Sequence, residues 1–152
     1  MLQEIWDRFR KKWWNIEKVK NILKKYNSQI VLMQCNTNYT AELENFNYIH
    51  LNVLKTLREM YPSMVLGLSD HTPKHATVLG AVALGASMIE KHFTDQKTGR
   101  GFRDHELSAD PDDMKALVVD IGTIKESLGH YGKFRAAIET PNMLAVRKGI
   151  VA

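Results

Sequence analysis

The chain has 152 residues, 44% of them hydrophobic and 25% charged, a balance typical of one globular domain but too short for a complete (β/α)8 barrel of about 250 residues. The single cysteine, Cys35, excludes an internal disulfide framework, and no apolar run approaches the ~20 residues needed to cross a membrane. The start of the sequence lacks the apolar core of a signal peptide, so we expect a cytoplasmic protein.

The net charge of +4 is concentrated at the start of the chain. Residues 1–25 carry a net charge of +5, with eight basic residues against three acidic ones, and the remainder is close to neutral. A basic helix that contains Trp6, Trp13 and Trp14 could contact nucleic acid or an anionic membrane. The interpretation we favour is a solvated helix face, and neither nucleic acid nor a membrane is an expected partner.

Helical and strand-like stretches alternate along the chain. Residues 16–23 have the apolar spacing of a helix, and a continuous apolar run over 29–34 predicts a strand buried on both faces. A second helix over about 49–60 ends before Pro62, and a second strand covers 64–68. A third helix spans about 74–84 with Gly85 as its cap, and a third strand covers 87–90. The last helix begins around Ser108–Asp113, a dense start signal, and ends at Leu128–Gly129.

Repeating strand–helix units of this size fit either a doubly wound sheet or part of a barrel. No glycine-rich phosphate-binding loop follows any of the strands, which argues against a dinucleotide-binding or P-loop fold. Either remaining architecture places the carboxyl ends of its parallel strands at one edge of the sheet.

Two histidines, His71 and His92, each follow a predicted strand directly. Neighbouring parallel strands would place these imidazoles side by side at the edge where α/β proteins carry their chemistry. Other polar residues near the same strand ends are Ser69, Asp70, Glu90, Lys91 and Asp104. This arrangement predicts a combined metal and anion site, and a two-histidine site leaves coordination positions open for water and substrate.

Four motifs occur in order: Ser69-Asp70-His71-Thr72, Ala83-Leu84-Gly85-Ala86, Glu90-Lys91-His92-Phe93-Thr94, and Asp104-His105 with Ser108 and Asp110-Pro111. Together with Cys35-Asn36-Thr37-Asn38-Tyr39 they resemble the sialic acid synthase family, which includes N-acetylneuraminate, legionaminate and pseudaminate synthases. The resemblance implies a partial TIM (β/α)8 barrel with about three parallel strands and flanking helices. It divides the chain into a basic helix at 1–27, the C-terminal half of the barrel at 28–130, and a linker at 131–152 toward an absent antifreeze-like domain.

The resemblance also implies roles for individual residues. His71 and His92 match the family's metal ligands, with Mn2+ or Mg2+ as the expected ion, and are the catalytic residues. Thr37 and Ser69 match positions that contact phosphoenolpyruvate, and Tyr39 and Asp104 match positions that contact the aminosugar. Their hydroxyl and carboxylate groups suit those contacts. Cys35 follows a buried strand, so we expect it to pack in the core.

The implied reaction condenses phosphoenolpyruvate with an N-acylated aminosugar similar to N-acetylmannosamine, giving a nine-carbon 2-keto sugar acid. C3 of phosphoenolpyruvate attacks the open-chain aldehyde, water adds to C2, and phosphate leaves by C–O cleavage. The family's phosphate-binding lysines and early acidic residues have no counterpart here, so the chain resembles a fragment truncated at both ends, and we expect no turnover from it alone. The alternative is a non-catalytic half-barrel that binds a complementary half-barrel or a second copy of itself.

Overall fold

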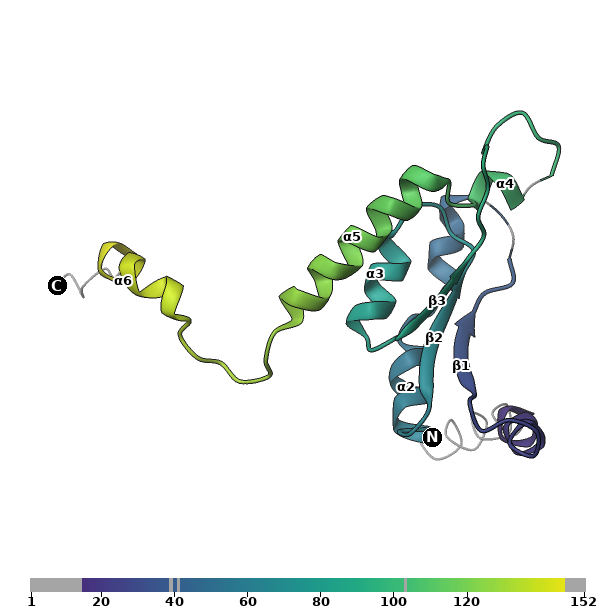
Figure 1. Cartoon of the computed structure of the whole chain (residues 1–152), viewed down its shortest axis with the longest axis horizontal. Helices are drawn as coiled ribbons and strands as arrows, with labels where there is room; N and C mark the ends of the chain where they lie inside the picture. Colours follow the sequence, from purple (N-terminus) through teal and green to yellow (C-terminus); the bar gives the residue numbers. More distant parts are fainter. Residues whose placement is uncertain (1–14, 39, 41, 103, 147–152) are drawn as a thin grey trace.

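The computed structural model describes residues 15–38, 40, 42–102 and 104–146, and it contains one three-stranded sheet flanked by helices (Figure 1). Residues 15–23 are helical. The remaining elements, in chain order, are β1 (Val31–Cys35), the 3-10 helix η1 (Leu43–Tyr48), α2 (Val53–Met60), β2 (Val65–Asp70), α3 (Ala76–Ala83), β3 (Met88–Lys91), α4 (Asp104–Leu107), α5 (Pro111–Leu128), the 3-10 helix η2 (Ala137–Glu139) and α6 (Thr140–Val146).

The sheet is parallel throughout, with the strands in the order β1-β2-β3. Val31 pairs with Val65 and Gly67 pairs with Met88, so the carboxyl ends of all three strands meet at one edge. Helices α2 and α3 pack on β2, and α5 packs on α3. Figure 1 shows these three helices on the same side of the sheet. The predicted fold class, three parallel strands with flanking helices as in part of a (β/α)8 barrel, is confirmed.

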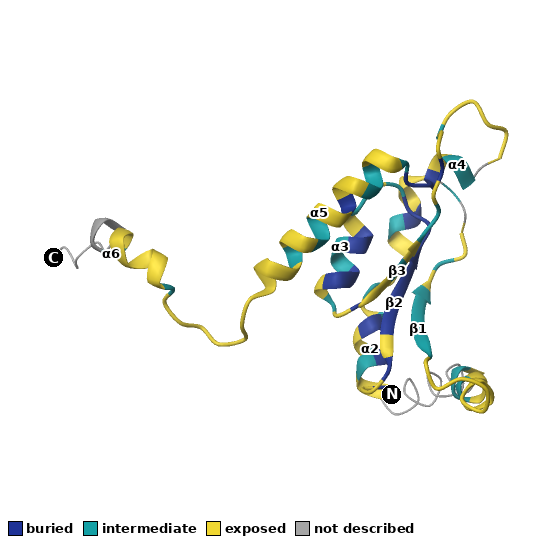
Figure 2. Cartoon of the chain, in the orientation of Figure 1, coloured by how far each residue is buried: buried dark blue, intermediate teal, exposed yellow. Residues whose placement is uncertain are grey.

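The core lies between the sheet and these helices (Figure 2). Because side chains alternate across a strand, Leu66 and Leu68 of β2 point to the helices and are fully buried. Leu32 of β1 and Ile89 of β3 join them, and α2 and α3 contribute Leu54, Leu57, Val78 and Ala81. This apolar layer fixes which residues of each strand face the opposite side.

On the opposite face of the sheet, no helix formed by the described residues lies against the strands (Figure 1). By the same alternation this face bears Val65, Gly67 and Ser69 from β2, with Met33 and Met88 beside Gly67 on the two neighbouring strands. A Cβ atom on Gly67 would lie 2.7 Å from the Met88 carbonyl oxygen and 3.0 Å from the Met33 side chain. Only glycine leaves room for this close approach.

Local signals set the ends of the helices. Gly85, with a φ of 93°, follows α3, and its N–H donates to the Val82 carbonyl while the Ala86 N–H donates to the Ala81 carbonyl. These are the two hydrogen bonds of a Schellman motif, in which glycine is favoured. At the start of α5 the Asp110 side chain accepts from the Asp113 N–H in a capping box. Gly85 and this start signal were both predicted.

Several short elements differ from the predictions. The helix expected from residue 49 begins at Val53, and the chain before it forms η1. Helices α4, η2 and α6 interrupt stretches that were predicted to be loop or linker. Each spans seven residues or fewer, too short for a periodic apolar pattern to indicate it. Among the residues that the structure describes, no helix is both long and apolar enough to cross a membrane.

Candidate functional site

His71 and His92 converge at the carboxyl edge of the sheet. Strand β2 ends at Asp70 and β3 ends at Lys91, and these two residues are register partners. The histidines that follow them place their imidazole centroids 5.1 Å apart, with the ring planes inclined by 71°. The geometric part of the sequence prediction, two neighbouring imidazoles at this edge, agrees with the structure.

His71 is buried, and its ring is fixed by the end of β1. Its Nδ1 lies 2.9 Å from the Asn36 carbonyl oxygen, which can only accept a hydrogen bond. The Nδ1 atom therefore carries a proton, and whenever the ring is neutral its lone pair resides on Nε2. The Cys35 Sγ is 3.9 Å from the same Nδ1. A histidine whose Nδ1–H is donated to a backbone carbonyl is the usual arrangement for a metal ligand that binds through Nε2.

His92 is partly exposed, and a backbone hydrogen bond ties it to the segment before α5. Its carbonyl oxygen accepts a hydrogen bond from the Ala109 N–H, and Phe93 and Ala109 form a parallel bridge. Its Nδ1 lies 3.6 Å from Asp104 Oδ2, a separation longer than a hydrogen bond. Asp104 therefore lies beside a predicted metal ligand.

The donor set at this edge fits a divalent ion held by two imidazoles. His71 has the tautomer that a ligand needs, and the His92 ring adjoins a carboxylate that can orient it. Within the described residues, no group of three or more His, Cys, Asp and Glu side chains is placed to hold a metal. The remaining coordination positions would then belong to water and substrate.

Ser69 faces the open side of the sheet, one residue before the end of β2. It is buried, and its hydroxyl donates a 2.6 Å hydrogen bond to Glu90 Oε1 on β3. Before Ser69 could donate to an anionic ligand, this bond to the carboxylate would have to break. Glu90 is thus the hydrogen-bond partner of Ser69, while its neighbour Lys91 pairs with Asp70.

The predicted contacts from the segment after β1 are placed in part. Thr37 is exposed and directly follows Asn36, the residue whose carbonyl holds His71. Tyr39 lies outside the described residues. Cys35 is exposed rather than packed in the core, because it ends the edge strand β1 and faces the side of the sheet away from the apolar core. The expectation for Cys35 was therefore wrong.

A network of asparagines supports the same segment and was not predicted. Asn45 is buried, and its Oδ1 accepts a 3.0 Å hydrogen bond from Asn36 Nδ2. Its own Nδ2 donates to the Asn38 carbonyl at 3.1 Å. The repeated asparagines at 36, 38 and 45 were the only sequence signal for this network. The Asn36 carbonyl that holds His71 leaves no sequence signal, because it is a backbone atom.

A second polar cluster secures the loop after His92. The Thr94 hydroxyl is 2.7 Å from His105 Nδ1, and Lys97 forms ion pairs with Asp113 and Asp110 at the start of α5. The hydrogen bond from Lys97 lowers the pKa of Asp113, and the same bond raises the pKa of Lys97. Both residues are therefore charged near neutral pH and tie the loop to α5.

Comparison with known proteins agrees with this arrangement. The model of the NeuB family matches residues 12–133. The chain belongs to the NeuB family. It is 37% identical to N,N'-diacetyllegionaminic acid synthase of Campylobacter jejuni over 90% of its own length, and 32% identical to human N-acetylneuraminate-9-phosphate synthase over 75%. The family is therefore one of sugar-acid synthases, as the sequence motifs indicated.

Two solved members of similar fold are a sialic acid synthetase from Leptospira borgpetersenii and the spore coat polysaccharide biosynthesis protein SpsE of Bacillus subtilis. The TM-scores are 0.69 and 0.65, with 33% and 32% identity over 86% and 84% of this chain. The chain covers 44% and 38% of these two proteins. It covers 40% of the Campylobacter enzyme and 31% of the human one, so it spans less than half of each relative.

Proposed function

We propose that this chain supplies the metal-binding edge of a synthase that condenses phosphoenolpyruvate with an N-acylated aminosugar to a 2-keto sugar acid. The observation that carries the proposal is the convergence of His71 and His92, with ring centroids 5.1 Å apart, at the carboxyl edge of a NeuB-family sheet. A divalent ion such as Mn2+ or Mg2+, when bound there, would act as a Lewis acid toward the sugar carbonyl.

The chain's own residues would bind and orient the substrates. Thr37 would donate a hydroxyl hydrogen bond to phosphoenolpyruvate, as would Ser69 once it has left Glu90, and Asp104, next to His92, would accept hydrogen bonds from the sugar. Tyr39 is proposed for the sugar on the sequence resemblance alone. The solved Leptospira relative is a complex with citrate, which is an oxygen-rich anion as phosphoenolpyruvate is. A cytoplasmic location stays a prediction of the sequence.

We do not propose that the 152-residue chain alone catalyses this condensation. Two lysines near the sheet edge have little to offer a phosphate trianion, because Lys91 is paired with Asp70 and Lys97 with Asp113. We expect no condensation product when the purified chain is incubated with both substrates and Mn2+. Detection of product by mass spectrometry would contradict this expectation.

The metal half-site is tested by calorimetric titration of the purified chain with Mn2+. We expect binding near one ion per chain that is lost in His71→Ala. The matched control is His130→Ala, since His130 is exposed beyond the end of α5 and contacts Phe134 rather than the site. No binding by the folded native chain, or equal binding by His71→Ala, would overturn the proposal.

A second candidate function, a non-catalytic half-barrel that binds a complementary half-barrel or a second copy, is favoured by the open face of the sheet. Val65 and Met88 on this face are 44% and 45% exposed, although strands of a parallel sheet are normally covered on both faces. Sedimentation of the native chain and of Val65→Lys tests this function. Monomers in both cases would exclude self-association, whereas loss of a dimer in the variant would favour it.

A further inference from the structure

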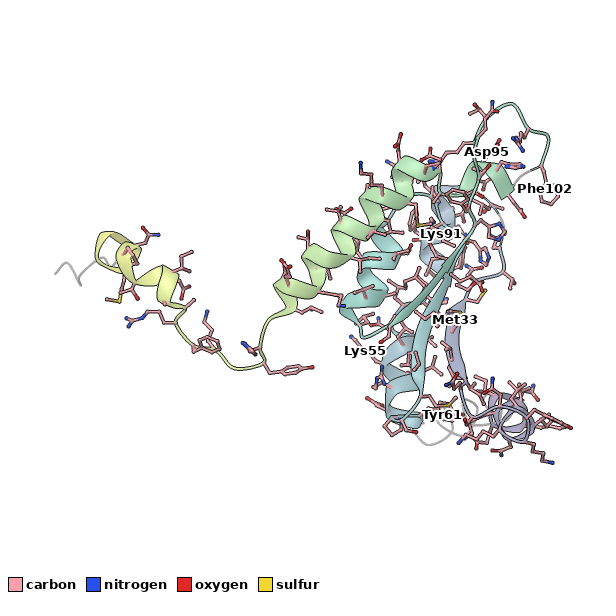
Figure 3. All side chains as sticks on the ribbon, viewed as in Figure 1. Met33, Lys55, Tyr61, Lys91, Asp95 and Phe102 are labelled. Carbon is pink, nitrogen blue, oxygen red and sulfur yellow. The ribbon has the colours of Figure 1, made fainter. Side chains whose placement is uncertain are left out.

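The ends of β2 and β3 are joined by a buried ion pair on the helix side of the sheet. Lys91 Nζ lies 2.7 Å from Asp70 Oδ2, and the two side chains are 3% and 0% exposed. Each residue directly precedes one of the two histidines. Figure 3 labels Lys91 beside these strand ends. The pair is on the opposite side of the strands from Ser69 and Glu90.

Hydrogen bonds satisfy the buried charges of this pair. Asp70 Oδ1 accepts from the Thr72 N–H at 3.2 Å, from the Thr72 hydroxyl at 2.8 Å and from the Thr77 hydroxyl at 2.9 Å. Lys91 Nζ also donates to the Thr72 carbonyl oxygen at 2.5 Å. A buried ion pair persists only with such additional partners, because removing two charges from water is costly.

The ammonium group of Lys91 thereby contacts the chain on both sides of His71. One hydrogen bond reaches the side chain of residue 70 and the other reaches the backbone of residue 72. The strand ladder ends at the Asp70–Lys91 pair, so no regular ladder continues through the histidines. Lys91 and the turn that Asp70 caps therefore hold the chain immediately before and after His71.

We propose that Lys91 and Asp70 are positioning residues that set the distance and orientation of His71 relative to His92. This inference rests on the proposed function, because the positioned imidazoles are its metal ligands. Neither Lys91 nor Asp70 would touch metal or substrate. A single Lys–Asp contact acts on both histidines at once, since its two residues belong to the two strands that carry them. Well-packed apolar residues can be as stabilising as a buried pair, so orientation is the property the pair supplies.

The test uses the full chain in the double variant Asp70→Asn/Lys91→Met, which removes both charges and leaves neither one buried alone. The matched control is Lys97→Met, which breaks the ion pairs of Lys97 with Asp110 and Asp113 without touching β2. The readouts are the nuclear Overhauser effect between the two imidazoles and the ring 15N shifts of His71, which report its tautomer. Neither readout requires a metal.

We expect the native chain and Lys97→Met to show the ring-to-ring effect and a single Nδ1-protonated tautomer of His71. The double variant should lose at least half of the ring-to-ring intensity and mix the two tautomers, while amide contacts between β2 and β3 persist. Its affinity for Mn2+ should fall about tenfold or more, the usual effect of removing support from a ligand. A folded double variant with native ring contacts and tautomer would overturn the proposal.

A measurement on the native chain covers the case in which the double variant does not fold. The proposal requires the Lys91 ammonium protons to exchange slowly with water in 15N-lysine spectra, whereas those of exposed Lys74 exchange rapidly. Rapid exchange at Lys91 would refute the proposal. Failure of the native chain to bind Mn2+ counts against the proposed function alone, because the ring contacts and the tautomer are measured without metal.

Discussion

Lys91 and Lys97 both form ion pairs with aspartates near the carboxyl ends of β2 and β3, and these ion pairs differ in burial. Lys91 and Asp70 are 3% and 0% exposed and join two strands, whereas Lys97 and Asp113 are 34% and 33% exposed and join a loop to α5. The first contact is enclosed by threonine hydrogen bonds. The second is shared with solvent and with Asp110. A Lys–Asp ion pair thus joins two strands inside the protein at Lys91, and it joins an exposed loop to α5 at Lys97.

The largest difference between the two lysines should appear in the unfolding free energy when each is replaced by methionine. Lys91→Met leaves the Asp70 carboxylate buried without its cation, which costs about 3–5 kcal/mol of unfolding free energy. Urea denaturation followed by circular dichroism measures this loss. Lys97→Met is the control and should lose under about 1 kcal/mol, because solvent screens its carboxylates. Equal losses in the two variants would contradict the comparison.

An intermediate effect is expected at the start of α5. Asp110→Ala removes the acceptor for the Asp113 N–H and should cost about 1 kcal/mol, the usual value of an N-cap. Asp112→Ala is the matched control, since Asp112 is exposed in the same first turn and is not the cap. Thermal unfolding measures both. A loss in Asp112→Ala as large as that in Asp110→Ala would show that helix-end charge, rather than capping, is responsible.

The smallest effect is the pH dependence of the exposed pair. Because Lys97 lowers the pKa of Asp113, the pair's contribution is present above the carboxyl's ordinary pKa of 3.8 and is lost as pH falls through the lowered value. The pKa of Lys97 is raised, so its contribution is present below the ordinary 10.5 and is lost as pH rises through the raised value. The stability difference between native chain and Lys97→Met should be flat between these limits and shrink outside them. A difference that grows toward acid would contradict the assignment.

The sequence predicted the parts of this molecule that depend on local patterns. Apolar runs located all three strands to within a few residues, and Asp110 and Gly85 marked helix ends because capping uses specific side chains. Placing His71 and His92 together followed from parallel strands alone. The motif resemblance identified the family and narrowed two possible architectures to one.

Other features required three-dimensional pairing and could not be found in the sequence. Asp70 caps the local turn at Thr72, but its contact with Lys91 joins residues 21 positions apart in the sequence. The Asn36 carbonyl that orients His71 is a backbone atom, so any residue could provide it. Cys35 was misplaced because a continuous apolar run does not reveal which face of a strand is covered.

The central claim is that His71 and His92 form one metal half-site, and the most direct measurement follows all histidine ring signals by NMR during titration with substoichiometric Mn2+. The account predicts that the rings of His71 and His92 broaden together and first. The ring signal of His130, which is exposed beyond the end of α5 and contacts Phe134, should broaden later. Broadening of only one of the two site rings, or equal broadening of all of them, would contradict the claim.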